Sequence, residues 1–295
     1  MVGPGQIATV IVVGTAIGAV LSFALAWYAH RTFDHPTADP FAVVMVTDGL
    51  WALANLGVLL VDGDLLLRAF DASRTLFAVL AAIVWVRFVA IYTGDREWLP
   101  VWTFPVLLAE AAGYGVLWIA NPGGLVLADY TTDTYGGLTL VSQDLEVLAV
   151  LQILLIYALL GASLVMLARF LVRSRNAYRL QTGLIALLLV LIGVGALAWP
   201  VGVTPHPGLD LTPLLFVTQG ALVWLALTRF DFLRVVPTAA ETLLEEMGDP
   251  VFVVGQDARV LDCNRAAASL LGADAGDAAV DDLLPAPLAR AIRTT

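Results

Sequence analysis

Residues 145–168 read LEVLAVLQILLIYALLGASLVMLA, and the basic stretch RFLVRSRNAYR follows at 169–179. The first stretch carries a single charged residue, Glu146. An α-helix needs about 20 apolar residues to cross roughly 30 Å of hydrocarbon. Residues 145–168 therefore predict a membrane-spanning helix, and the four arginines after it indicate the side of the membrane on which it ends.

The composition of the whole chain extends this reading. Its 295 residues are 60% hydrophobic and 14% charged, with a mean hydropathy of +0.87. Soluble domains usually carry about 25% charged residues. The low charge places the chain in the membrane class.

Six further stretches have the length and apolar character of a span, which gives seven in total. The seven are 7–29, 40–61, 75–93, 99–120, 145–168, 180–201 and 211–230. The first does not resemble a signal peptide, because MVGPGQ has no positive charge and the apolar run is too long.

The arginines between these spans predict the orientation, because basic loops stay in the cytoplasm. With the N-terminus outside, the cytoplasmic side receives Arg31, Arg96, Arg169, Arg173, Arg175, Arg179, Arg229 and Arg234, and the outside receives Arg68 and Arg74. We therefore expect a multi-pass plasma-membrane protein with a cytoplasmic C-terminus. The Gly-, Thr- and Tyr-rich segment 121–143 then becomes an extracellular loop with a short hairpin.

A helix signal follows the last span. Pro237 precedes Thr238, and Glu241 lies three residues beyond the threonine, which makes a capping box. One face of the predicted helix carries Ala240, Leu243, Leu244 and Met247. This signalling helix is expected to pack on a partner or on a second copy, or else on its own domain.

The C-terminal segment is acidic and has its own pattern. Residues 238–295 hold ten acidic residues and four arginines, a net charge of −6, which argues against nucleic-acid binding. The runs PVFVV and RVLDC predict two strands around the turn GQDA. Asn264 is placed to cap the helix RAAASLL, which Gly272 ends.

This segment, DPVFVVGQDARVLDCNRAAASLLG at 249–272, resembles the start of a PAS domain, a sensor and dimerisation module. The resemblance covers roughly 245–290, so we expect a partial domain that lacks its last three strands. Such a unit has an open sheet edge and a half-built core. It is expected to be poorly ordered alone or completed by a partner.

The membrane part resembles the seven-transmembrane N-terminal region of sensor histidine kinases. The segments that carry the resemblance, in order, are YTGDREWL (92–99), NP (121–122), YRLQ (178–181), LDLTP (209–213) and LTRFDFLRVVPTA (227–239). The resemblance implies a seven-transmembrane sensor domain at 1–232, a linker or signalling helix at 233–248 and a partial PAS-like domain at 249–295. The predicted fold is thus an all-α seven-helix transmembrane bundle with a small, incomplete α+β cytoplasmic tail.

The chain departs from a complete histidine kinase. Its histidines are His30, His35 and His206, all around the membrane part, and no GxxxxGK pattern occurs. We therefore expect a sensor part without phospho-acceptor histidine, ATP-binding domain or enzymatic activity. No cofactor or metal motif is evident, and a retinal Schiff base is excluded because the sequence has no lysine. The one cysteine, Cys263, is expected to be a small buried residue.

Three ionisable residues fall inside predicted spans: Asp48, Arg87 and Glu110. Such residues usually face the bundle interior and pair with one another. We hypothesise that they share one network, which serves either as a signal-dependent switch or as a structural lock between helices.

Other residues favour simpler readings. The tryptophans Trp51, Trp85, Trp102, Trp118 and Trp199 suit membrane interfaces and helix packing, with a ligand cage as the alternative. Pro105 and Pro200 are expected to kink their helices, and Pro213 to lie in a first turn.

The preferred function is a membrane receptor that relays a cue from the bundle to the PAS-like segment. Its expected partners are the lipid bilayer, a second copy of the chain, and a separate histidine kinase or response regulator. The alternatives are a small-molecule or ion transporter or membrane enzyme with a vestigial tail, and a scaffold that recruits a kinase.

Overall fold

A computed structural model describes residues 3–33, 36–95, 100, 102–173, 176–198, 201–204, 206, 208–229, 247–254 and 260–271. The chain divides into two compact units, Met1–Val236 and Pro237–Thr295. Each unit is described by itself.

The described part of the first unit contains seven α-helices. They are α1 (Pro4–Thr32), α2 (Ala38–Leu60), α3 (Asp64–Thr93), α4 (Thr103–Ala120), α5 (Val147–Arg173), α6 (Asn176–Ala198) and α7 (Thr212–Arg229). The first six are long and apolar enough to cross a membrane, whereas the apolar part of α7, Thr212–Leu227, is shorter. The structure therefore supports a multi-pass membrane protein with six candidate spans.

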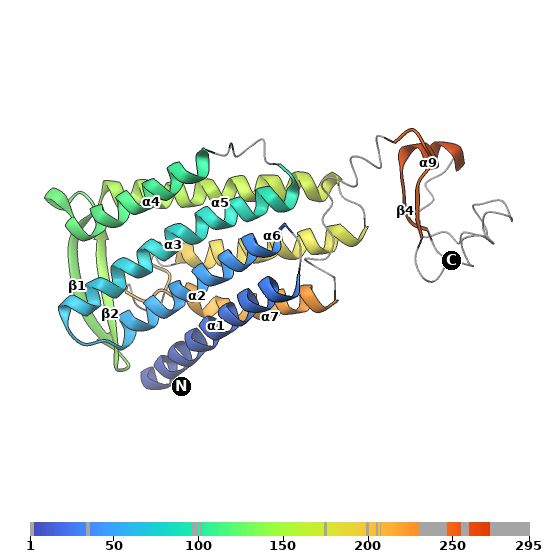
Figure 1. Cartoon of the computed structure of the whole chain (residues 1–295). Coiled ribbons are helices and arrows are strands. Elements are labelled where there is room, and N and C mark those ends of the chain that lie inside the picture. The colour runs from blue at the N-terminus through green and yellow to red at the C-terminus, as the bar shows by residue number, and fades with distance from the viewer. Residues whose placement is uncertain are drawn as a thin grey trace. The chain divides into compact units, whose positions relative to one another are not determined.

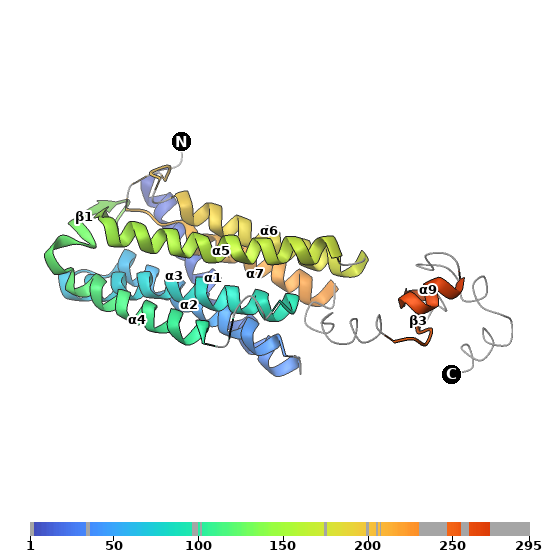
Figure 2. The same cartoon turned by 90° about the horizontal axis from the view of Figure 1, so that it is seen from above.

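The helices form a ring with one member outside it. Around the ring, α1 packs against α2, α2 against α3, α3 against α5, α5 against α6, α6 against α7, and α7 against α1 (Figure 1, Figure 2). Helix α4 packs against α3 outside this ring. The contact between α1 and α7 depends on Gly18, where an added Cβ would lie 3.1 Å from the Pro213 carbonyl oxygen. Small residues of this kind let helix backbones approach closely in membranes.

Two helix starts differ from the sequence prediction. Helix α3 begins at Asp64 instead of residue 75. The prediction missed its first turns because they contain charged residues and interrupt the continuous apolar stretch. Helix α4 begins at Thr103, so Pro105 lies in its first turn. A proline in the first turn removes no helical hydrogen bond, and the kink expected there is wrong. Pro213 lies in the first turn of α7, as predicted.

A hairpin covers one end of the bundle, as the sequence of 121–143 predicts. Strand β1 (Leu127–Tyr135) pairs antiparallel with β2 (Leu138–Leu145) (Figure 1). The turn is Gly136–Gly137, with φ of 60° and 87°, and paired positive φ angles favour glycine in a tight hairpin. Leu138 and Leu140 are buried against α1 and α2, and Val141 against α2 and α3.

Asn121 joins α4 to this hairpin, before the short 3₁₀ helix η2 (Pro122–Gly124). Its φ is 39°, in the left-handed region that ends a helix. Its side-chain oxygen accepts hydrogen bonds from the backbone N–H groups of Val126 and Leu127, and its amide donates to the Leu127 carbonyl. The pair Asn121–Pro122 therefore has a local structural role.

The described part of the second unit contains the two predicted strands and the predicted helix. Strand β3 (Phe252–Val254) pairs antiparallel with β4 (Val260–Cys263), and α9 (Arg265–Leu271) follows. Asn264 accepts hydrogen bonds from the backbone N–H groups of Ala267 and Val251 and donates to the Met247 and Asp249 carbonyls. It therefore caps α9 and ties that helix to the chain before β3.

Several sequence predictions concern residues that lie outside the described ranges. These residues are Thr238, Glu241, Leu243 and Leu244 of the signalling helix, the segment 272–295, and also Arg96, Arg175, Arg234, Trp199 and Pro200. Met247 is described and is 45% exposed.

Candidate functional site: a cavity inside the bundle

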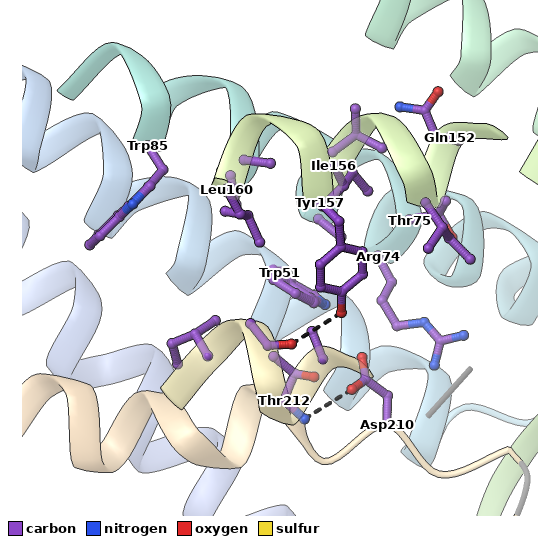
Figure 3. A pocket seen from close by; sticks show the side chains of 18 of the residues that line it. Trp51, Arg74, Thr75, Trp85, Gln152, Ile156, Tyr157, Leu160, Asp210 and Thr212 are labelled. Atoms are coloured by element: carbon purple, nitrogen blue, oxygen red, sulfur yellow. Dashed lines mark hydrogen bonds between the residues drawn. The ribbon is translucent and has the colours of Figure 1, made fainter. Parts of the chain in front are cut away.

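A cavity of about 170 Å³ lies within the bundle (Figure 3). Helices α2 to α7 line it, and β2 and Asp210 contribute from the hairpin end. Its walls are mostly aliphatic side chains from α3, α5 and α6, with the rings of Trp51 and Trp85 among them. Concave, mostly apolar sites with a few polar groups are the usual form of small-molecule sites.

The polar groups of this cavity are unusual because many lack a partner. Twelve buried side-chain atoms in the described part of the chain have no hydrogen bond, and six of them belong to residues that line the cavity. The six are Trp51 Nε1, Trp85 Nε1, Gln143 Oε1, Gln152 Nε2, Thr212 Oγ1 and Gln219 Oε1. The Gln152 side chain also interacts with the Glu110 carboxylate, so five of the six lack any polar partner. A buried polar atom without a partner costs about 1–3 kcal/mol. Such a concentration leaves hydrogen-bonding capacity for a bound molecule or for buried water.

Asp48 and Gln219 connect the cavity to α7. The Gln219 amide donates a hydrogen bond of 2.9 Å to the Asp48 carboxylate, which joins α7 to α2. Asp48 is 6% exposed and Gln219 is 3% exposed. The Asp48 carboxylate of α2 is therefore linked directly to α7, the last described helix of the first unit.

A buried ion pair borders the hairpin end of the cavity. Arg74 donates to Asp71 at 2.6 Å, and Gln143 of β2 donates to the other Asp71 oxygen at 2.6 Å. Nearby, the Arg68 guanidinium lies 4.5 Å from the centre of the Tyr130 ring. Both arginines, predicted as loop residues, thus belong to α3 and hold the hairpin on it.

Two further hydrogen bonds at the cavity hold backbone groups in place. The Tyr157 hydroxyl donates to the Gly193 carbonyl at 3.1 Å, and Asp210 accepts from the Thr212 backbone N–H at 2.9 Å (Figure 3). The second bond satisfies one free N–H at the start of α7.

The structure does not bring Asp48, Arg87 and Glu110 into one network. Asp48 bonds to Gln219, whereas Arg87 is exposed and lies 4.1 Å from the centre of the Phe104 ring. Glu110 lies beside Gln152, and no ion pair joins these three described residues. Arg87 is two turns from the end of α3, so its long side chain reaches outward instead of inward.

The predicted tryptophans separate into two groups. Trp51, Trp85 and Trp118 line the cavity, whereas Trp102 is 67% exposed, as interface tryptophans are. Sequence reasoning missed Gln152 and Gln219, which are amides inside apolar helices. That pattern was an available signal, because polar side chains in membrane helices are kept for contacts between helices or with ligands.

The hairpin carries titratable groups of its own. A hydrogen bond from the Thr134 backbone N–H lowers the pKa of Asp133, and His206, 3.1 Å away, lowers it further. Burial raises the pKa of Tyr130 to about 12. Among the described residues, no group of three His, Cys, Asp or Glu side chains is placed to hold a metal ion.

Two family models match the chain. One family model, a PAS domain, matches residues 241–293, in agreement with the resemblance at 245–290. A second, the N-terminal 7TM region of histidine kinase, matches residues 14–237, about three quarters of the chain. Both families define a membrane-bound sensory signalling protein. The chain belongs to the family of N-terminal 7TM regions of histidine kinases. No curated protein gives a significant match to this chain.

Proposed function

We propose that this chain is the sensing module of a histidine-kinase-type signalling protein, and that a small molecule in the cavity is its cue. The unpartnered polar atoms in the cavity wall carry the proposal. The family match supports the sensory role. Binding shifts α7, and α7 passes the shift to the PAS-type unit.

The membrane arrangement that we propose has seven spans. The apolar part of α7 has sixteen residues, or about 24 Å at 1.5 Å per residue, and its start lies where the hairpin covers the bundle. Arg31, Arg169, Arg179 and Arg229 lie near the helix ends opposite the hairpin. Basic residues favour the cytoplasmic side, which supports an external N-terminus and a cytoplasmic C-terminus.

The relay requires that the cue bind one bundle state more tightly than the other, because a ligand with equal affinity for both shifts nothing. The hydrogen bond between Asp48 and Gln219 supports this proposal, because it joins α2 to α7 at the cavity wall, where a ligand that competes for it favours one position of α7. We propose that the signal continues through residues 233–248 to the unit at 249–295. A second copy of the chain, or a histidine kinase or response regulator, then receives it.

Hydrogen exchange on the full chain in lipid nanodiscs tests this function. 2-Phenylethanol serves as a neutral, cavity-sized probe. We expect it to slow exchange in peptides from α7 and to change exchange in 250–271. Ala82→Leu, which adds bulk inside the cavity, removes both effects, and Ala112→Leu, on the exposed face of α4, keeps them.

Two results would contradict this function. Equal effects in both alanine variants would show that the probe acts through the lipid. Slower exchange in α7 with no change in 250–271 would leave the cavity as a binding site and remove the relay.

A further inference from the structure

We infer that the cavity selects small organic cations with an apolar body, and that Asp48 and Gln219 together bind the positive group. This inference rests on the proposed function, because it names the chemical class of the cue that the cavity takes.

The charge of the cavity wall supports a cationic ligand. Asp48 is buried, and its one hydrogen bond comes from the neutral amide of Gln219. A buried carboxylate is costly unless a cation or several donors accompany it. The described cavity wall offers no such cation to Asp48: its one arginine, Arg74, is paired with Asp71.

A second carboxylate makes the imbalance larger. Asp210 also lines the cavity, and its hydrogen bond comes from a neutral backbone N–H. The described wall thus holds two carboxylates that no cationic side chain neutralises. An anionic ligand meets repulsion from both, whereas a cation meets attraction.

Gln219 provides an independent observation. Its Nε2 donates to Asp48, while its Oε1 is buried and has no partner. The two atoms belong to one amide, so an acceptor without a donor lies beside the carboxylate. An ammonium group has three N–H donors and no acceptor, and it satisfies Asp48 and Gln219 Oε1 together. A neutral hydroxyl has one proton and satisfies one of them.

The rest of the cavity fits the apolar part of such a molecule. Trp51 and Trp85 line the wall, and a cation near an indole face gains further attraction. The volume of about 170 Å³ is close to that of the roughly 150 Å³ apolar cavity that binds benzene in an engineered protein. The site therefore takes a molecule built on one ring or an equivalent aliphatic group.

Three probes of one shape test the inference: 2-phenylethylamine, 2-phenylethanol and phenylacetate. Each is titrated into the purified full chain in nanodiscs of zwitterionic lipid, with tryptophan fluorescence and calorimetry as readouts. We expect the amine to bind about tenfold or more tightly than the alcohol, which corresponds to about 1.4 kcal/mol. Phenylacetate should bind least.

Variants assign the preference to the named residues. Asp48→Asn should bring the amine and the alcohol within about threefold of each other, because one unpaired charge is gone. Asp39→Asn is the matched control: it removes a carboxylate from the same helix α2, but Asp39 is exposed in the first turn of that helix and does not line the cavity. It should keep the wild-type ratio. Gln219→Met serves as a second variant, and it should weaken the amine more than the alcohol.

The outcomes separate the two proposals. Wild-type protein that binds the alcohol as tightly as the amine overturns the cation inference and leaves the cavity as a sensor site. Failure of all three probes to bind overturns both. An unchanged amine preference in Asp48→Asn and in Gln219→Met also overturns the assignment. The wild-type comparison holds even if a variant does not fold.

Discussion

The ion pair between Asp71 and Arg74 predicts a large, specific loss of stability on substitution. The side chains of Asp71 and Arg74 are 1% and 7% exposed, and their closest N–O distance is 2.6 Å. Asp71→Ala leaves Arg74 buried without its partner and removes the acceptor of the Gln143 amide. Breaking a buried pair costs about 3–5 kcal/mol. We therefore expect about 4 kcal/mol, or roughly a thousandfold in the unfolding equilibrium.

The assay is reversible unfolding of the full chain in mixed micelles, followed by circular dichroism. His30 and Asp39 give a matched control, because they form a pair of 2.8 Å with side chains 64% and 76% exposed. Exposed pairs contribute about 0–1 kcal/mol, so Asp39→Ala should have little effect. Hydrogen exchange of β2 should rise in Asp71→Ala alone.

A double variant tests the cause of the loss. Asp71→Val with Arg74→Met replaces both charges by apolar groups, and such replacements of buried pairs are often neutral. It should recover most of the stability. The reasoning is refuted if Asp71→Ala costs no more than Asp39→Ala, since the pair would then be exchanging freely with water.

Other predictions concern the hairpin and the helix contacts. The pKa of Tyr130 is raised from 10.0 to about 12 in the folded protein. The contribution of the neutral Tyr130 side chain to the stability of the fold should therefore be lost as the pH rises from 10 to 12. Tyr130→Phe should remove that loss at almost no cost at neutral pH, because the buried hydroxyl has no described partner; alkaline unfolding curves measure both. The pKa of Asp133 in the folded protein is lowered from 3.8. The protection of the hairpin from hydrogen exchange should therefore persist above pH 3.8 and fall as the pH drops through the pKa of the folded protein. Asp133→Asn should flatten this pH profile. Gly18→Ala should destabilise the bundle by about 1–3 kcal/mol through overpacking on α7. Gly161 has open space around it, so Gly161→Ala should be neutral or stabilising. Equal thermal stabilities of the two variants would contradict this prediction. Asn121→Ala should cost about 3 kcal/mol through three hydrogen bonds and a left-handed backbone, and Asn121→Gly, which tolerates that backbone, about 1 kcal/mol less.

Apolar length and turn chemistry were enough to predict most of the fold. The helices α1, α2, α5 and α6 lie within a few residues of the predicted spans, because each is a continuous apolar run. The Gly-, Thr- and Tyr-rich composition of 121–143 predicted the hairpin. The polar start of α3 was missed because the hairpin, which is distant in sequence, provides partners for Arg68 and Asp71.

The site was harder to predict because it is a product of packing. Asp48 was identified as a site residue from its charge alone. Its partner Gln219 lies 171 positions away, and no single window places the two together. Arg87 was assigned to the interior because charged residues in membrane helices usually lie there, yet its position near a helix end lets its side chain reach the surface.

Cys263 gives the second unit a built-in reporter. It is the one thiol of the sequence, and it lies 6% exposed in β4, next to the residue that caps α9. An alkylating reagent reacts with a buried thiol when the surrounding structure opens, so the modification rate measures how often that opening occurs. A signal that loosens or tightens this unit should therefore change the rate in the unmodified protein, without any engineered label.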